Sequence, residues 1–335
     1  MRVAVDAMGG DHAPREIIRG VAAGLKYLSD SDEVYLYGPQ ERVEAECEAL
    51  GLSDPRVKLH HCPSVIEMHE APVVALRRKR DSSIVRMAVA AGKGELDALI
   101  SAGNTGAFAA ACQLRIKTIK GVSRPGIAVV MPAFHGPVLV CDVGANVAPK
   151  PHHLHEYARM CAAYAQTILH IPEPEIGLVS IGEEEGKGNP LVKEAGHLIK
   201  SDPSLHFAGN VEGRDIFAGS SHVFICDGFV GNVVLKLTEG LSEGLFKTIV
   251  REIGVESAEL AEHFAPIVDR IWKKHDFTEY GGAPLLGINS VVVICHGRSD
   301  QRAISNAIRV ATETIHINLN AIISEQLAPS KEVPA

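Results

Sequence analysis

Short apolar runs rich in valine and isoleucine recur along the whole chain, and most are separated by longer stretches with a helical spacing of apolar positions. An apolar run bounded by Gly, Asn or Asp is typical of a buried β-strand. Such runs predict strands at residues 2–6, 34–38, 57–62, 97–101, 126–131, 138–142, 175–181, 206–209, 222–227 and 291–296. Apolar positions three and four residues apart predict helices at 14–28, 40–50, 82–93, 104–119, 152–170, 190–200, 230–253, 257–274 and 300–327.

This alternation of strands and helices predicts a three-layer α/β/α fold, with crossover helices on both faces of a mainly parallel sheet. Runs 126–131 and 138–142 are separated by a loop too short for a helix, so we expect an antiparallel pair and a mixed sheet. No Pro- or Ser-rich linker divides the chain. We therefore expect a single domain over 1–327 and a disordered tail at 328–335, which is polar and contains proline.

One segment departs from the alternation. Residues 230–274 contain two consecutive helical patterns, with a turn near 254–257 and no strand between them. Two long helices joined in this way predict an αα-hairpin that projects from the α/β body.

Many predicted strands end in short loops rich in Gly, Asn and acidic residues. Because ligands bind at the carboxyl ends of strands in open α/β sheets, we expect these loops to form one composite polar site of an enzyme. The candidate substrate-binding residues in these loops are Asp6, Gly9, Gly10, Asp11, Ser101, Gly103, Asn104, Thr105, Gly106, Asp142, Asn146, Asn189, Asp227 and Lys236.

The loop SAGNTGA, residues 101–107, joins a predicted strand to a predicted helix. Its glycines permit a tight turn, and the free N–H groups at the start of the helix would suit an anion such as phosphate. The loop has neither the lysine of a P-loop nor the glycine spacing of a dinucleotide site. A plain turn capped by Asn104 or Thr105 remains the alternative.

Two further residues are suited to catalysis. Lys187 lies between two glycines on a predicted loop, where it could neutralise phosphate or a developing oxyanion, or could simply be a solvated lysine. Asn232 follows the strand-end sequence DGFVG, where it could donate a hydrogen bond to an oxyanion or could cap the following helix.

Composition narrows the functional classes. With 33 Lys and Arg against 41 Asp and Glu, the net charge is −8, which disfavours binding to nucleic acid. The absence of a long apolar segment and of a signal-peptide pattern predicts a cytoplasmic protein. The seven cysteines are scattered without a CxxC pair, so we expect small buried side chains and no metal site.

The basic run Arg77, Arg78, Lys79 and Arg80 could dock an acidic partner or form a solvated face.

The motifs DAMGGDHAP, RRKRDSS, SAGNTGA, DVGAN, KGN, GNVEGRD, DGFVGNVVLK and YGGAPLLG occur in this order between Met1 and about Gly297. Together they resemble the bacterial phosphate acyltransferases of phospholipid synthesis. The resemblance implies transfer of an acyl group from acyl carrier protein to inorganic phosphate, without a cofactor. It also implies a fold related to the isocitrate and isopropylmalate dehydrogenases, and a homodimer.

Carried over by motif, the catalytic residues of the family fall on Lys187 and Asn232. From the basic run itself we expect that Arg77 to Arg80 dock the acidic carrier protein. The helical hairpin that contacts the membrane surface in the family falls on about 245–275. That segment carries four glutamates beside its apolar residues, which oppose binding to anionic lipid. Two alternatives remain open: an NAD-dependent dehydrogenase of related fold, and a non-catalytic protein that binds acyl carrier protein.

Overall fold

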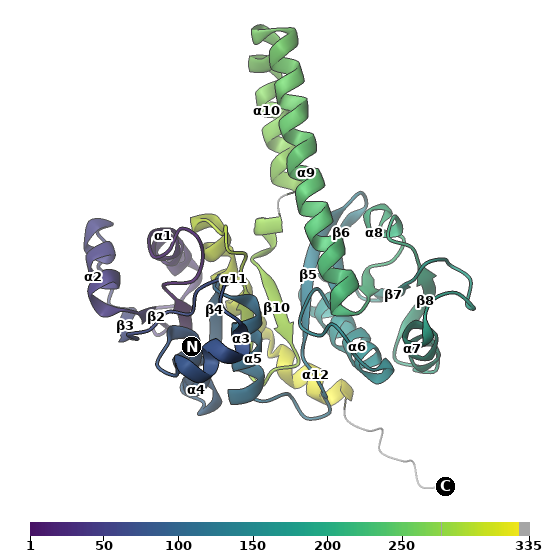
Figure 1. Ribbon diagram of the computed structural model, residues 1–335, viewed down its shortest axis with the longest axis horizontal. Helices are drawn as coiled ribbons and strands as arrows, with labels where there is room; N and C mark the ends of the chain where they lie inside the picture. The colour runs from purple at the N-terminus through teal and green to yellow at the C-terminus, as the bar shows by residue number, and fades with distance from the viewer. Residues whose placement is uncertain (276, 328–335) are drawn as a thin grey trace.

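A computed structural model describes residues 1–275 and 277–327, which contain one sheet of eleven strands in the order β3-β2-β1-β4-β11-β10-β5-β6-β9-β7-β8 (Figure 1). The strands are β1 (Arg2–Asp6), β2 (Glu33–Gly38), β3 (Val57–His61), β4 (Ala98–Ser101), β5 (Gly126–Ala133), β6 (Gly136–Cys141), β7 (Glu175–Val179), β8 (His206–Val211), β9 (Val223–Ile225), β10 (Ala283–Leu286) and β11 (Val291–Ile294). The helices are α1 (Arg15–Gly24), η1 (Leu25–Tyr27), α2 (Gln40–Ala49), α3 (Pro72–Arg78), α4 (Ser83–Gly92), α5 (Thr105–Arg115), α6 (Pro151–Thr167), α7 (Pro190–Lys200), α8 (Asp215–Ala218), α9 (Gly228–Glu256), α10 (Ala258–His275), η2 (Phe277–Tyr280), α11 (Gln301–Ile317) and α12 (Leu319–Leu327).

The sheet is made of two parallel blocks that run in opposite directions. Strands β3, β2, β1, β4 and β11 form the first block, and β6, β9, β7 and β8 form the second. Between them, β10 runs antiparallel to both β11 and β5, and β5 runs antiparallel to β6. The mixed, mainly parallel sheet and the antiparallel pair β5–β6 are therefore confirmed.

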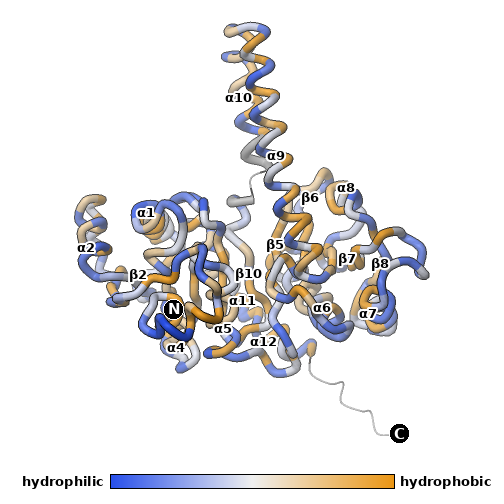
Figure 2. Tube along the Cα trace, viewed as in Figure 1, coloured by the Kyte–Doolittle hydropathy of each residue, from blue (hydrophilic) through white to orange (hydrophobic). Residues whose placement is uncertain are grey.

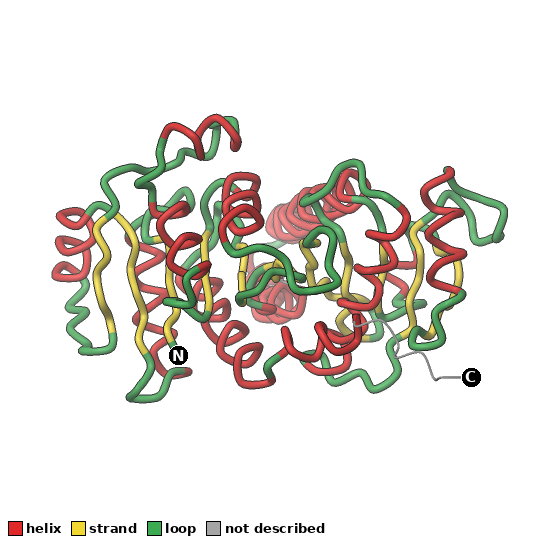
Figure 3. The backbone as a smooth tube through the Cα atoms, turned by 90° about the horizontal axis from the view of Figure 1, so that it is seen from below, coloured by secondary structure: helices red, strands yellow, loops and turns green. Residues whose placement is uncertain are grey.

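Helices cover both faces of the sheet, which gives the predicted three layers (Figure 3). On one face, a single apolar core extends over both blocks beneath α4, α5, α8 and the start of α9. On the other face, α1, α2 and α11 cover the first block and α6, α7 and α12 cover the second. In β1, for example, Val3 and Val5 belong to one core and Ala4 to the other. Strands buried on both faces have nearly continuous apolar sequences, which is why the runs were recognisable.

Several elements differ from the predicted set, among them the short helices α8 and η2, which were not predicted. Strand β10 was not predicted, because the four residues Ala283–Leu286 are too few to show a period. The short helix α3 was also missed. The predicted helix over 300–327 is broken at Asn318, whose φ of +56° ends α11 before α12 begins.

The predicted hairpin is confirmed. Helices α9 and α10 reverse direction at Ser257 and project from the body (Figure 1). Apolar residues alternate with polar ones along both helices (Figure 2). No helix in residues 1–275 and 277–327 is both long and apolar enough to cross a membrane.

The first turns of α9 are fixed to the loop after β6. The carboxylate of Asp142 accepts hydrogen bonds from the backbone N–H groups of Ile127, Gly144, Ala145 and Asn146 at 2.7–3.1 Å, and this shapes the loop. Glycines 228 and 231 then allow α9 to lie directly on it. A Cβ at position 228 would be 2.7 Å from the carbonyl oxygen of Asn146, and one at position 231 would overlap the carbonyl oxygen of Asp142.

Gly231→Ala tests this contact. The added methyl group meets backbone atoms that cannot turn away, so we expect the free energy of unfolding to fall by about 1–3 kcal/mol. Gly240→Ala is the matched control on the same helix, because a Cβ there has no neighbour within 4 Å. It should be neutral or stabilise by up to about 1 kcal/mol. Urea unfolding measures both, and equal stability of the two variants would contradict the packing described.

Candidate active site

The strand-end loops form two groups instead of one. Because the two blocks are antiparallel, the carboxyl ends of β1, β4 and β11 lie at one edge of the sheet and those of β6, β9 and β7 at the other. The expectation of a single composite site at one edge is therefore wrong. Periodicity identifies strands but does not give their direction.

The first group is centred on Asp6, at the end of β1. Its buried carboxylate accepts hydrogen bonds from the Ser101 hydroxyl at 2.8 Å and from the Met8 N–H at 3.2 Å. Ser101 Oγ in turn accepts from the Gly103 N–H at 3.0 Å. Burial raises the pKa of Asp6, against these hydrogen bonds. The network joins the loops after β1 and β4.

The glycines of this group allow close backbone contact. A Cβ on Gly9 would be 2.6 Å from the Gly103 nitrogen, and Gly10 has a φ of +102°. The neighbouring Asp11 has an exposed side chain, and its N–H donates to the Gly297 carbonyl at 2.7 Å. These residues build the loop, and their contact with a substrate stays a prediction.

Asn104 is the N-cap of α5. Its side-chain oxygen accepts from the Ala107 N–H at 3.0 Å, and its amide nitrogen donates to three carbonyls of the loop 67–70 at 2.9–3.2 Å. Thr105 and Gly106 occupy the first two helical positions, where backbone N–H groups have no intrahelical partner. The exposed first turn of α5 therefore offers two N–H groups to an anion.

In the second group, Asp142 and Asn146 are buried and engaged with the protein itself. The Asn146 amide nitrogen donates to Pro125 O at 2.7 Å and to the Tyr157 hydroxyl at 2.8 Å. Burial raises the pKa of Asp142, although its backbone hydrogen bonds favour the carboxylate. These contacts identify the pair as residues that position the loop and the start of α9.

Two more candidates are helix caps. Asn189 accepts from the Val192 N–H at the start of α7, and Asp227 accepts from the N–H groups of Phe229 and Val230 at the start of α9. Because Asp227 is the cap of α9, the capping alternative for Asn232 is excluded. Lys187 is exposed on the loop between β7 and α7, and within the described chain its ammonium group has no hydrogen-bond or ion-pair partner.

Asn232 and Thr105 line the same cavity, although their loops follow different blocks. The cavity has a volume of about 150 Å³ and also receives Val143, Lys236, His296 and Ser299. Helix α9 makes this possible, since it begins after β9 and continues past the end of β11. Lys187 does not line this cavity; it lies on the loop after β7, the strand next to β9.

His296 was missed in the sequence. Lys236 Nζ lies 2.9 Å from His296 Nε2 and 2.7 Å from Glu239 Oε2, so the lysine joins the two walls of the cavity. Burial, and then the charge of Lys236, lower the pKa of His296. The strand-end pattern used for the other candidates could have identified His296. The apolar run Val291–Ile294 is followed by the polar loop CHGRSD, which contains it.

In the basic run Arg77–Arg80, three side chains are exposed and one is bound to other residues of the chain. Arg77, Arg78 and Arg80 are exposed, but Lys79 donates to the Glu70 carboxylate at 2.5 Å and to the Val65 carbonyl at 2.6 Å. Lys79 therefore holds the segment before α3, and the expectation that it docks a partner is corrected for this residue. Helix α3 packs on α5, with Pro72 against Gly106.

All seven cysteines are buried free thiols, as expected. Within residues 1–275 and 277–327, no group of three or more His, Cys, Asp or Glu side chains is arranged to hold a metal ion.

Known proteins resemble the chain over nearly its whole length. A family model described as "Fatty acid synthesis protein" matches residues 1–322. Proteins named phosphate acyltransferase from Desulforamulus reducens and Desulfitobacterium hafniense are 44% and 46% identical, and the alignments cover 99% and 98% of both chains.

Among solved structures, a phosphotransacetylase from Streptococcus pyogenes has a TM-score of 0.63 at 20% identity, covering 94% of each chain. A 4-hydroxythreonine-4-phosphate dehydrogenase from Klebsiella pneumoniae has a TM-score of 0.53 at 13% identity, covering 95% of this chain and 99% of that one. These two likenesses concern the fold. The identity to the full-length relatives, together with the family model, shows that the chain belongs to the phosphate acyltransferase family.

Proposed function

We propose that this protein transfers a fatty acyl group from the thioester of acyl carrier protein to inorganic phosphate, giving an acyl phosphate for phospholipid synthesis. The observation that carries the proposal is the cavity in which Asn232 meets the first turn of α5. Family membership favours this reaction over a nicotinamide-dependent dehydrogenase. It also favours an enzyme over a protein that only binds the carrier.

The site matches direct attack by phosphate. A phosphate oxygen attacks the thioester carbonyl, the electron pair of the carbonyl moves to its oxygen, and the tetrahedral intermediate then expels the thiolate. A thiolate is a good leaving group, so no strong acid is required. Cys295 is the one cysteine lining the cavity, and burial raises its pKa to about 12. It stays a thiol at neutral pH and is a poor nucleophile.

Different residues would stabilise the charge of phosphate and the charge of the tetrahedral intermediate. Phosphate is an anion and the intermediate carries a second negative charge, so donors and cations must be aimed at both. The N–H groups of Thr105 and Gly106 would hold phosphate in the cavity. The ammonium group of Lys187, on the loop after β7 and outside the cavity, is the cation that the family motif assigns to the reaction. The exposed amide of Asn232 would donate to the oxyanion.

The test is phosphate-dependent loss of acyl-carrier thioester. Lys187→Ala and Asn232→Asp should each lower turnover by about 100-fold or more, since each removes a donor for developing charge. Both positions are exposed, so the free energy of unfolding should change by under about 1 kcal/mol. Lys193→Ala is the control, because Lys193 is an exposed lysine on the next helix. Turnover near that of the control would reject the role of either residue, and a wild-type reaction independent of phosphate would reject the function.

Carrier-protein docking is proposed at α3. The exposed guanidinium groups of Arg77 and Arg78 lie on the helix that packs against the first turn of α5, so an acidic partner bound there would reach the cavity. Arg77→Glu with Arg78→Glu should raise the KM for the carrier-bound substrate at low salt. The effect should shrink near physiological salt, where charges are screened beyond about 8 Å. Lys26→Glu with Arg42→Glu makes the same charge change at exposed positions of the α1–α2 region and should leave KM unaltered; equal effects of the two pairs would refute specific docking.

We also propose a cytoplasmic homodimer whose hairpin tip touches the membrane surface. Val255 at the tip is 77% exposed, and Leu260 is 42% exposed. Val255→Glu with Leu260→Glu should reduce flotation with anionic vesicles, because two apolar contacts are replaced by charges repelled from the surface. Leu237→Glu with Leu241→Glu changes two exposed residues at the base of α9. We expect this variant to form a weaker dimer, as measured by ultracentrifugation, and to float with vesicles as the wild type does. Unchanged flotation of the tip variant would exclude membrane contact by the tip.

A further inference from the structure

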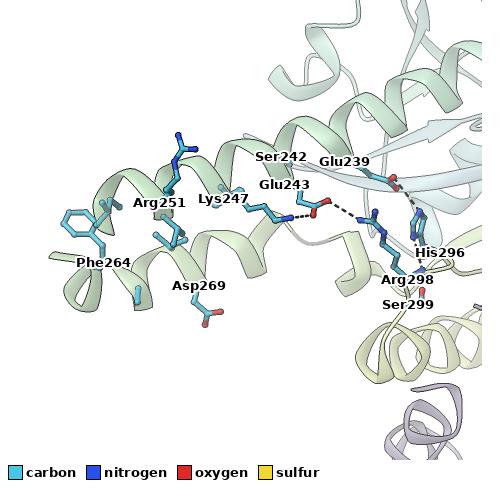
Figure 4. A pocket seen from close by; sticks show the side chains of 16 residues that line it. Glu239, Ser242, Glu243, Lys247, Arg251, Phe264, Asp269, His296, Arg298 and Ser299 are labelled. Carbon is cyan, nitrogen blue, oxygen red and sulfur yellow. Dashed lines mark hydrogen bonds and ion pairs between the residues drawn. The ribbon is translucent and has the colours of Figure 1, made fainter. Parts of the chain in front are cut away.

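A long apolar groove runs between the two helices of the hairpin (Figure 4). It encloses about 880 Å³. Phe246, Val250 and Ile253 line it from α9, and Ala261, Ala265 and Val268 line it from α10. Helix α9 packs on α10, and the space between these side chains stays unfilled.

The groove adjoins the cavity that holds Asn232. Glu239, His296 and Ser299 line both spaces, so the two share a wall where the hairpin meets the body. A molecule whose reacting carbon lies beside Asn232 could therefore extend into the groove without leaving the protein surface.

Polarity changes along the groove. At its base, Lys236, His296 and Arg298 lie close to the cavity, and Arg298 pairs with Glu243 at 3.3 Å. Farther along, Lys247 pairs with the same glutamate at 2.6 Å. Apart from Arg251 and Asp269, the lining beyond this pair is apolar (Figure 4). A charged base and an apolar length suit an amphiphile with an anionic head and an aliphatic tail.

The length of the groove also fits such a tail. Its lining follows α9 from Glu239 to Ile253, a rise of about 21 Å at 1.5 Å per residue. An extended long-chain acyl group is of this order, whereas a short acyl group would occupy only the base.

We infer that this groove binds the fatty acyl chain of the substrate and of the acyl phosphate product. The inference rests on the proposed function, and it adds the site that would give the reaction its chain-length preference. The wall provided by Ala261 and Ala265 sets the width of the groove, so larger side chains there would exclude the tail.

The experiment measures binding of alkylphosphonates, which mimic acyl phosphates and do not react. Calorimetry compares butylphosphonate with hexadecylphosphonate, the latter below its micelle concentration. Each methylene in an apolar site improves affinity by up to about fourfold, so the wild type should prefer the long chain by at least about 100-fold. Ala265→Phe, and independently Ala261→Phe, should reduce that preference at least about tenfold.

Ala258→Phe is the matched control, since Ala258 is an exposed alanine on the same helix that does not line the groove. It should keep the wild-type preference, and circular dichroism verifies that each variant is folded. A preference unchanged in both groove variants would overturn the inference, as would a wild type without chain-length dependence. A groove variant that alters only the oligomeric state would overturn it too, in favour of a contact between copies of the chain. The thioester assay is separate, so failure of the groove and failure of the proposed function are distinguishable.

Discussion

The buried carboxylate of Asp142 determines where helix α9 begins. Its removal from water is unfavourable for the charged form, and four backbone N–H groups compensate by donating to it. Those hydrogen bonds give the loop after β6 its shape, and glycines 228 and 231 let α9 lie against that shape with no side chain between. Because α9 is one continuous helix, contacts that fix its first turn also fix the positions of the residues farther along it.

Three features depend on that arrangement. Asn232, in the second turn, faces the cavity shared with Thr105. One turn later Lys236 meets His296 from the other block of the sheet. Beyond Glu239 the same helix forms one wall of the hairpin groove. The antiparallel blocks place their strand ends at opposite edges, and a helix that crosses from one to the other is what brings residues of both to one cavity.

Much of this fold could be predicted because both faces of the sheet are covered. The strands therefore appear as apolar runs, and the hairpin appears as two helical patterns without a strand. The direction of the blocks could not be predicted, since an apolar period is the same in either direction. Strand β10 was missed because four residues show no period.

Site residues were harder to assign than elements. Asn104, Asn189 and Asp227 are residue types that serve equally as helix caps and as ligands, and their partners are visible only in three dimensions. Lys79 belongs to an exposed basic run by sequence, yet a glutamate nine positions earlier neutralises it. His296 follows the same strand-end pattern as the residues that were selected, so it could have been found.

The two lysines considered for the proposed reaction, Lys187 and Lys236, differ in their surroundings. Lys236 is held by Glu239 and His296, so its position is set before any ligand arrives and its charge is already partly balanced. Lys187 has no such partner in the described chain and lies on a loop bracketed by glycines, so its charge is available. An incoming phosphate would gain most from the unbalanced cation, while the fixed cation keeps the base of the groove polar. An amphiphilic product bound in the cavity and the groove would have its head held by charge and its tail by apolar surface, which are two independent contributions that chain length and salt can separate.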